Sequence, residues 1–126
     1  DEQIGAPVSN SVDDLVVMNG PSLHKFLPNL KPGGTLFINS SIVKDPIDRD
    51  DITVVSVPVT EMALEMGNAR ILNIIMLGAY VGYTKAVEPE VITKGIHHKF
   101  ENKPKVIPIN DKAFETGLEI GRNWGK

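Results

Sequence analysis

The chain has 126 residues, of which 41% are hydrophobic and 23% are charged, and its formal net charge is −3. This size and composition are typical of one globular domain, and the weakly acidic balance argues against a nucleic-acid-binding protein. The sequence contains no cysteine. This excludes disulfides, thiolate zinc sites and cysteine-held iron–sulfur clusters on this chain, and it fits a cytoplasmic protein.

The first half of the chain predicts a strand–helix–strand unit. Leu15–Met18 and Thr35–Ile38 are short apolar runs, typical of strands that are buried on both faces of a parallel sheet. Between them we expect Gly20 to cap a short helix that starts at Pro21 and ends by Pro28. This spacing is that of a βαβ unit with a right-handed crossover.

Polar residues follow both predicted strands. Asn19 comes after the first strand, and Asn39, Ser40 and Ser41 come after the second. Because ligands of open α/β sheets bind beyond the carboxyl ends of the strands, we expect Asn19 and Asn39–Ser41 to lie on the same rim.

A polar segment, Lys44–Asp51, separates this unit from a third predicted strand, Ile52–Val59. The four aspartates of the segment do not have the spacing of a calcium loop, which favours a solvated connection over a metal site. We expect Thr60 to cap a short helix, Glu61–Met66, which Gly67 terminates.

The longest apolar segment predicts a buried helix over Ala69–Lys85. Its side chains from Ile71 to Val81 are apolar on all sides apart from Asn73, which we expect to be buried and to bind a neighbouring loop. Gly78 and Gly82 leave one face bare enough for another backbone to approach. The apolar run is too short and too interrupted for a membrane span, so a core helix is favoured and no membrane contact is expected.

The last part of the chain predicts two more helices. Pro89 starts a short helix that ends at His97, a polar loop follows, and Val106–Ile109 is expected to be extended. Asn110 is the expected cap of a final helix. One face of that helix carries Ala113, Phe114, Gly117, Leu118 and Gly121.

These elements together predict a single α/β domain over residues 1–126. Its architecture is a partial Rossmann-like, mostly parallel sheet with flanking helices and one long buried helix. The three histidines show no metal-binding pattern, and no serine has an identifiable base, so neither a metal site nor a self-contained hydrolase is expected.

The start of the long helix is the strongest candidate site. A helix N-terminus presents unpaired N–H groups that attract phosphate or carboxylate. Asn68 stands at the cap position, Gly67 gives access, and Arg70 can add bidentate contacts. The residues alone leave a second interpretation open, in which Asn68 only caps the helix and Arg70 pairs with a neighbouring acid.

Three stretches resemble the gamma subunit, or gamma domain, of the 2-oxoacid:ferredoxin oxidoreductases. They are Ile4–Pro7, DLVVMNGPSLHKFLPNLKPGGTLFINSSIV (residues 14–43) and VPVTEMALEMGNARILNIIMLGAYVG (residues 57–82). Members of that family begin with a strand and a glycine-rich loop of the GxGGQG type. That motif is absent here, so the chain resembles the C-terminal two-thirds of such a subunit.

The resemblance implies a subunit that is inactive alone. Its complex would decarboxylate a 2-oxoacid oxidatively, transfer the acyl group to coenzyme A and reduce ferredoxin. Thiamine diphosphate and iron–sulfur clusters would lie on the partners, which are alpha and beta subunits, with a delta subunit left open. Coenzyme A would contact Asn68 and Arg70, with Asn19 and Ser40 on the strand rim as further candidates. Gly67 and Asn68 resemble members that act on 2-oxoglutarate.

Two other interpretations stay open. The chain could be a purely structural module that joins the alpha and beta subunits, because the Gly78/Gly82 face fits an interface equally well. Leu30–Gly34 followed by a strand also resembles a late segment of Rossmann-like methyltransferases, which would bind S-adenosylmethionine.

Overall fold

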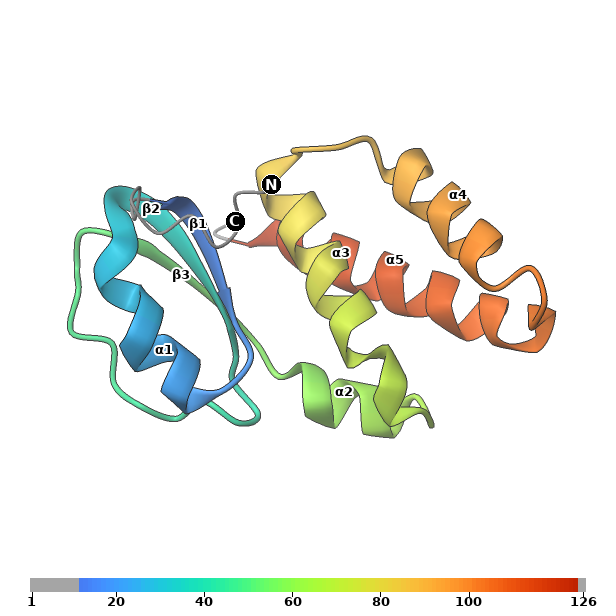
Figure 1. Cartoon of the computed structure of the whole chain (residues 1–126), viewed down its shortest axis with the longest axis horizontal. Coiled ribbons are helices and arrows are strands. Elements are labelled where there is room, and N and C mark those ends of the chain that lie inside the picture. Colours follow the sequence, from blue (N-terminus) through green and yellow to red (C-terminus); the bar gives the residue numbers. More distant parts are fainter. Residues whose placement is uncertain (1–11, 125–126) are drawn as a thin grey trace.

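The computed structural model describes residues 12–124, which form a small parallel sheet with helices on both faces (Figure 1). The strands follow one another in the sheet order β1-β2-β3, and both neighbouring pairs are parallel. The strands are β1 (Val12–Val17), β2 (Leu30–Asn39) and β3 (Thr53–Val57). The helices are α1 (Gly20–Phe26), α2 (Val59–Glu65), α3 (Leu72–Thr84), α4 (Pro89–Lys99) and α5 (Ile107–Asn123). This confirms the predicted α/β class and the βαβ unit.

The sheet has two buried faces because successive side chains of a strand point in opposite directions. Leu36 and Ile38 of β2 pack in the cluster that contains Leu23 of α1. Phe37, between them, packs in the cluster that contains Ile75 of α3. An apolar run without alternation is therefore explained by helices on both sides, α1 on one and α2, α3 and α5 on the other (Figure 1).

Helices α3 and α5 pack with their backbones in close contact, as the Gly78/Gly82 face predicted. A Cβ at Gly78 would lie 2.8 Å from the backbone nitrogen of Leu118, and one at Gly82 would lie 3.0 Å from that of Arg122. On the other helix, a Cβ at Gly117 would lie 2.9 Å from the backbone nitrogen of Ala79. The glycines of both helices are therefore packing residues.

Two predicted helix caps are wrong. The α1 cap is Asn19, whose side-chain oxygen accepts a bond from the Ser22 amide at 2.9 Å, and Gly20 is the first helical residue. Thr60 lies inside α2, which begins at Val59 after Pro58. The Thr60 hydroxyl is engaged elsewhere, because it accepts a bond from the Asn39 amide nitrogen at 2.9 Å.

The predicted extended segment Val106–Ile109 and the Asn110 cap are also wrong. A 3₁₀ turn, η3 (Pro104–Val106), leads directly into α5, and Asn110 lies within the helix. Pro108 suits the first helical turn because its missing N–H would be unpaired there in any case. The Asn110 side chain is buried and donates to the Val106 carbonyl oxygen at 2.8 Å.

The long helix also differs in detail from its prediction. Its first turn is a separate 3₁₀ turn, η2 (Ala69–Ile71), so α3 begins at Leu72. Asn73 is exposed and not buried. It was expected to be buried because the sequence around it is apolar, but one flank of α3 is not covered by the described residues, and Asn73 lies on that flank beside Leu77.

The C-terminal end of α3 offers a stability prediction at Lys85. This residue has φ +57°, the left-handed conformation that favours glycine, and its amide donates to the Val81 carbonyl oxygen at 2.8 Å. We expect Lys85→Gly to raise the free energy of unfolding by about 0.5–1 kcal/mol because the strain is relieved. Urea unfolding measures this, with Lys85→Ala as the control that keeps the strain. A Lys85→Gly variant no more stable than Lys85→Ala would contradict it.

Acid sensitivity is expected from the connection that precedes β3. Arg49 binds Asp51 at 2.8 and 3.0 Å and also donates to the carbonyl oxygens of Leu27 and Leu30. The hydrogen bond from Arg49 lowers the pKa of Asp51 below its ordinary 3.8. A lowered folded-state pKa contributes stability above that ordinary value and loses it as the pH falls further.

The measurement is urea unfolding of the wild type and Asp51→Asn at pH 7 and near pH 3. We expect the difference in unfolding free energy between the two proteins to shrink on acidification. The control is Asp50→Asn. It removes the exposed neighbouring carboxylate, which forms no ion pair within residues 12–124. A pH-independent difference for Asp51→Asn, or an equal pH dependence for Asp50→Asn, would speak against the pair.

Candidate functional site

The turn between α2 and α3 has the geometry predicted for Asn68. Gly67 adopts φ +92°, and no atom lies within 4 Å of the position that its Cβ would take. This left-handed residue ends α2 and leaves the surface beside it open. The side-chain oxygen of Asn68 then accepts a bond from the Arg70 amide at 2.9 Å, so Asn68 caps η2.

A cavity of about 270 Å³ opens beside this turn, and we call it the Asn68 cavity. It brings the η2 turn together with the C-terminal end of α4 and the start of α5. Its lining residues are Asn68, Arg70, Ile71, Lys99, Phe100, Lys103, Val106 and Asn110. Asn68 and Arg70 were predicted as a site, and the structure places them in one cavity.

The Asn68 cavity carries three cations and no acid among its lining residues. The cations are Arg70, Lys99 and Lys103. Within residues 12–124, no carboxylate lies within 4 Å of the Arg70 side chain, so the predicted alternative of an acid partner is not observed there. The Lys99 ammonium lies 5.6 Å from the centre of the Phe100 ring, within cation–π distance, and both residues line the cavity. This charge distribution suits an anion with several negative groups.

The strand rim has a structural role in the described chain. Asn19 and Ser40 both follow the carboxyl ends of parallel neighbouring strands, as predicted, but neither lines the Asn68 cavity. Asn19 caps α1, and the Ser40 amide donates to the Val57 carbonyl oxygen at 3.0 Å. The four residues predicted to contact coenzyme A therefore do not form one site within residues 12–124. Asn68 and Arg70 line the cavity, and Asn19 and Ser40 lie outside it.

Two other rim residues fasten β2 to α2. Asn39 is 2% exposed, and its side chain bonds both the Thr60 hydroxyl and the Ser41 amide. The Ser41 hydroxyl accepts from the Glu61 amide at 3.1 Å. The polar side chains of Asn39 and Ser41 are therefore used to hold the start of α2 against the sheet.

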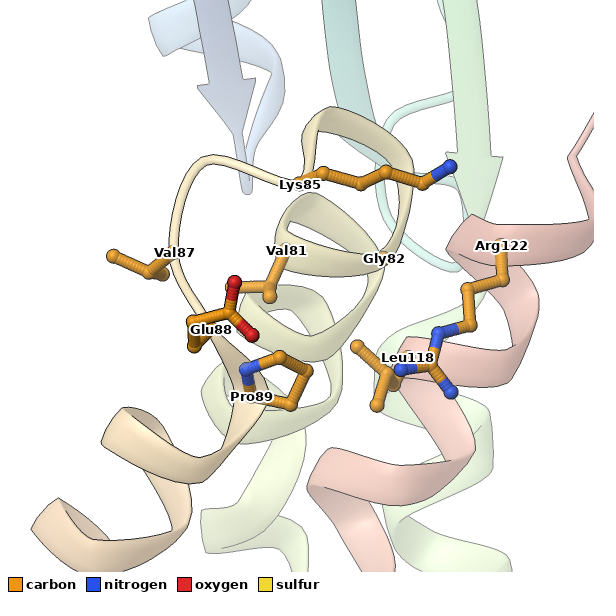
Figure 2. Close-up of a pocket in the computed structure, with 8 residues that line it drawn as sticks. All are labelled: Val81, Gly82, Lys85, Val87, Glu88, Pro89, Leu118 and Arg122. Carbon is orange, nitrogen blue, oxygen red and sulfur yellow. The ribbon is translucent and has the colours of Figure 1, made fainter.

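A second cavity, of about 210 Å³, lies at the opposite end of α3, and we call it the Arg122 cavity (Figure 2). Its charged residues are Lys85, Arg122 and Glu88. Figure 2 shows the Arg122 side chain beside Leu118 on α5 and the Glu88 carboxylate on the opposite wall, near Pro89. Because an acid offsets its two cations, this cavity suits a polyanion less well than the Asn68 cavity does.

The histidines are engaged with single carboxylates. His24 bonds Asp45 at 2.6 Å, and His97 at the end of α4 bonds Asp111 of α5 at 2.7 Å. No group of three histidine, aspartate or glutamate side chains in residues 12–124 is arranged to hold a metal ion. Across the same residues, no helix combines the length and the apolar character that crossing a membrane requires.

Sequence reasoning missed Lys99 and Lys103 as members of the site. Both fall in the polar loop that the sequence predicted after His97, whereas the structure continues α4 to Lys99. A charge pattern was available as a signal, because lysines recur at positions 99, 103 and 105 after two histidines. Their meeting with Arg70 depends on how the α4–α5 connection folds back, which no local pattern encodes.

Comparison with known proteins places these features in a wider context. Residues 1–120 match the family described as pyruvate ferredoxin/flavodoxin oxidoreductase. Ketoisovalerate oxidoreductase subunit VorA of Methanothermobacter marburgensis is 32% identical over 123 residues, which is 96% of this chain and 25% of VorA. The 2-oxoglutarate synthase subunit KorC of Methanocaldococcus jannaschii is 30% identical over 125 residues, 97% of this chain and 65% of KorC.

A solved structure has a similar fold. The gamma subunit of the keto/oxoacid ferredoxin oxidoreductase from Geobacter sulfurreducens superposes with a TM-score of 0.78 at 24% identity. The match covers 87% of this chain and 64% of that subunit. The present chain thus spans about a quarter of the length of VorA and about two-thirds of the length of the two shorter proteins.

Proposed function

The chain belongs to the pyruvate ferredoxin/flavodoxin oxidoreductase family, and from this premise we propose that it is the gamma-type part of a 2-oxoacid:ferredoxin oxidoreductase. In the proposed reaction, the assembled complex decarboxylates a 2-oxoacid oxidatively, forms an acyl-coenzyme A and reduces ferredoxin. The observation that carries the proposal is the family match, which extends over residues 1–120. The similarity of the fold to a gamma subunit of known structure supports it.

In this proposal the chain works only with its partners, in the cytoplasm. The partners are alpha and beta subunits, with a delta subunit left open, and they would carry the thiamine diphosphate and the iron–sulfur clusters. The absence of cysteine from this chain is consistent with that division, since cysteine thiolates are the usual cluster ligands. We assign no catalytic residue to this chain, because in this proposal the chemistry takes place on the thiamine diphosphate and the clusters of the partner subunits.

We place the coenzyme A contact at the Asn68 cavity. Coenzyme A carries a diphosphate and a 3′-phosphate, so it is a polyanion that several cations can bind at once. Arg70 can bind a phosphate bidentately, and Lys99 and Lys103 add two further positive charges to the lining of the same cavity. Asn19 and Ser40 on the strand rim are secondary candidates, which could contact another part of the ligand only if partner subunits complete that surface.

The proposed 2-oxoacid is 2-oxoglutarate. The residues that favour it are Gly67 and Asn68, and a similar relative is a 2-oxoglutarate synthase subunit. Another is a ketoisovalerate oxidoreductase subunit, so the test compares both substrates with pyruvate in the assembled complex. We expect the highest kcat/KM for 2-oxoglutarate. A higher value for 2-oxoisovalerate or pyruvate would contradict this assignment and leave the role of the chain in the complex intact.

The alternative role is a purely structural interface module. The observation that favours it is the uncovered flank of α3, where apolar side chains are left partly exposed by the described residues. The two roles differ in one measurement, the KM for coenzyme A of a complex whose Arg70 has been replaced. An unchanged KM supports the structural role alone. The methyltransferase interpretation has no support from the family match.

A further inference from the structure

The buried Asn110 side chain has one polar atom that no residue from 12 to 124 binds. The residue is 5% exposed, and its amide nitrogen donates to the Val106 carbonyl oxygen at 2.8 Å. Because a carbonyl oxygen only accepts hydrogen bonds, the nitrogen of the Asn110 amide must face it. The other amide atom, Oδ1, is therefore an acceptor to which no side chain or backbone N–H of the described residues donates.

This oxygen is accessible from the Asn68 cavity, which Asn110 lines. Among the described residues, the one fully enclosed side-chain atom without a partner is Oδ1 of Asp111, so Oδ1 of Asn110 is not sealed inside the protein. The bond to Val106 turns the Asn110 side chain back toward the start of α5, where the cavity opens. Since buried polar groups are normally hydrogen-bonded, this acceptor suits an N–H or O–H group of a ligand.

The other residues of the cavity lining differ in exposure according to their chemistry. The three cations are all exposed, so their charges meet a ligand from the solvent side. The apolar residues lie deeper, because Ile71 is 1% exposed and Phe100 and Val106 are half-buried. An apolar lining with a single hydrogen-bond acceptor suits a flat ring that carries an N–H donor, and the cations suit phosphates attached near that ring.

The cavity volume limits how much of coenzyme A can enter. The volume is about 270 Å³, whereas pockets that enclose a whole small-molecule ligand usually measure about 300–1,000 Å³. One end of coenzyme A therefore enters the cavity. The adenosine end combines a flat ring, a 6-amino donor and nearby phosphates. The pantetheine end is uncharged and gives the cations no partner, so the adenosine end fits better.

We propose that Asn110 determines base specificity in the Asn68 cavity, because its Oδ1 accepts a hydrogen bond from the 6-amino group of adenine. The adenine ring lies against Phe100 and Ile71, and the phosphates reach the exposed cations. This inference rests on the proposed coenzyme A contact, and it adds which end of the ligand binds and which residue recognises it. The thiol at the far end of the ligand stays free to reach the partner subunits.

The test compares coenzyme A with an analogue that has unsubstituted purine in place of adenine and so lacks only the 6-amino group. In the assembled complex, we expect the KM for the analogue to be about tenfold higher than the KM for coenzyme A, because the buried oxygen loses its donor. Asn110→Ser should bring this ratio close to one. A serine hydroxyl can donate to the carbonyl four residues earlier, so the bond to Val106 is kept while the acceptor is too short to reach the base.

Asn123 provides a matched control in the same helix. Its side-chain nitrogen donates to the Glu119 carbonyl oxygen at 3.0 Å, with the same four-residue spacing. Asn123 is exposed and lies outside the cavity, so Asn123→Ser should keep the tenfold ratio. The ratio of the two KM values is the decisive readout, because a merely structural loss raises the KM for both ligands alike.

Equal KM values for the two ligands in the wild-type complex would overturn the inference, and that comparison needs no variant. A tenfold ratio that persists in Asn110→Ser, or that Asn123→Ser abolishes as well, would also overturn it. Arg70→Ala separates these outcomes from failure of the proposed function. If Arg70→Ala raises the KM for coenzyme A while the wild-type ratio is one, only the adenine contact is wrong. If it leaves that KM unchanged and the ratio is one, the coenzyme A contact itself is wrong.

Discussion

Replacing all three cations of the Asn68 cavity is expected to raise the KM for coenzyme A of the assembled complex about hundredfold, which corresponds to about 2.7 kcal/mol. The variant is Arg70→Ala, Lys99→Ala and Lys103→Ala combined. Hydrogen bonds to charged groups contribute about 1.5–3 kcal/mol each in favourable sites, and solvent screening reduces this at an open cavity. The kcat should change little, because these contacts hold the ligand equally in the ground state and the transition state.

Single variants and a matched control sharpen this experiment. Arg70→Ala alone should raise the KM about tenfold, and Arg70→Lys should raise it less because the charge is kept while the bidentate geometry is lost. Arg122→Ala removes an arginine that lines the Arg122 cavity, and it should leave the KM for coenzyme A unchanged. An unchanged KM in the triple variant would exclude the Asn68 cavity as the coenzyme A contact and leave the interface role.

Substituting Gly117 by alanine is expected to cost about 3 kcal/mol or more of unfolding free energy. The new Cβ would overlap the carbonyl oxygen of Ile75 and lie 2.9 Å from the backbone nitrogen of Ala79. Both are backbone atoms of a buried helix, so neither can rotate away and α3 would have to separate from α5. Overpacking of a core by one or two methylenes usually costs 1–3 kcal/mol, and contact with rigid backbone places this site at the upper end of that range or above.

The matched control for Gly117→Ala is Gly95→Ala. Gly95 also lies inside a helix, α4, but no atom lies within 4 Å of its potential Cβ. Alanine there should stabilise the protein by about 0.5–1 kcal/mol through helix propensity. Chemical denaturation of both variants gives the comparison. A loss below about 1 kcal/mol for Gly117→Ala would show that the α3–α5 contact tolerates a side chain, contrary to the close packing described above.

Much of the fold could be predicted because its signals are local. The continuous apolar run of β2 correctly indicated a strand covered on both faces, and the spacing of Gly78 and Gly82 indicated a close helix contact. The same prediction was wrong for β1 within residues 12–124, because Val16 is 44% exposed there. The segment Val106–Ile109 was misassigned because a short run rich in β-branched residues is equally compatible with a strand and with a buried helix start. Its role as the beginning of α5 depends on the tertiary contacts that follow.

Only part of the candidate site could be predicted from the sequence. Asn68 and Arg70 stood out because a cap residue and a cation occur together at a helix start. Lys99 and Lys103 join them through the packing of the α4–α5 connection, and that long-range contact has no signature in the local sequence. The prediction that Asn73 is buried was wrong for a related reason. An apolar neighbourhood in the sequence does not reveal which flank of α3 the described residues leave open.

The proposed function is tested most directly by reconstitution of the oxidoreductase with and without this chain. Alpha and beta partner subunits, with the delta subunit where the complex has one, are purified and assayed for ferredoxin reduction that depends on both a 2-oxoacid and coenzyme A. We predict that ferredoxin is reduced only when this chain is added to the partner subunits. This chain alone should reduce none. Full activity of the partners without it, or measurable turnover by the isolated chain, would contradict the proposed role.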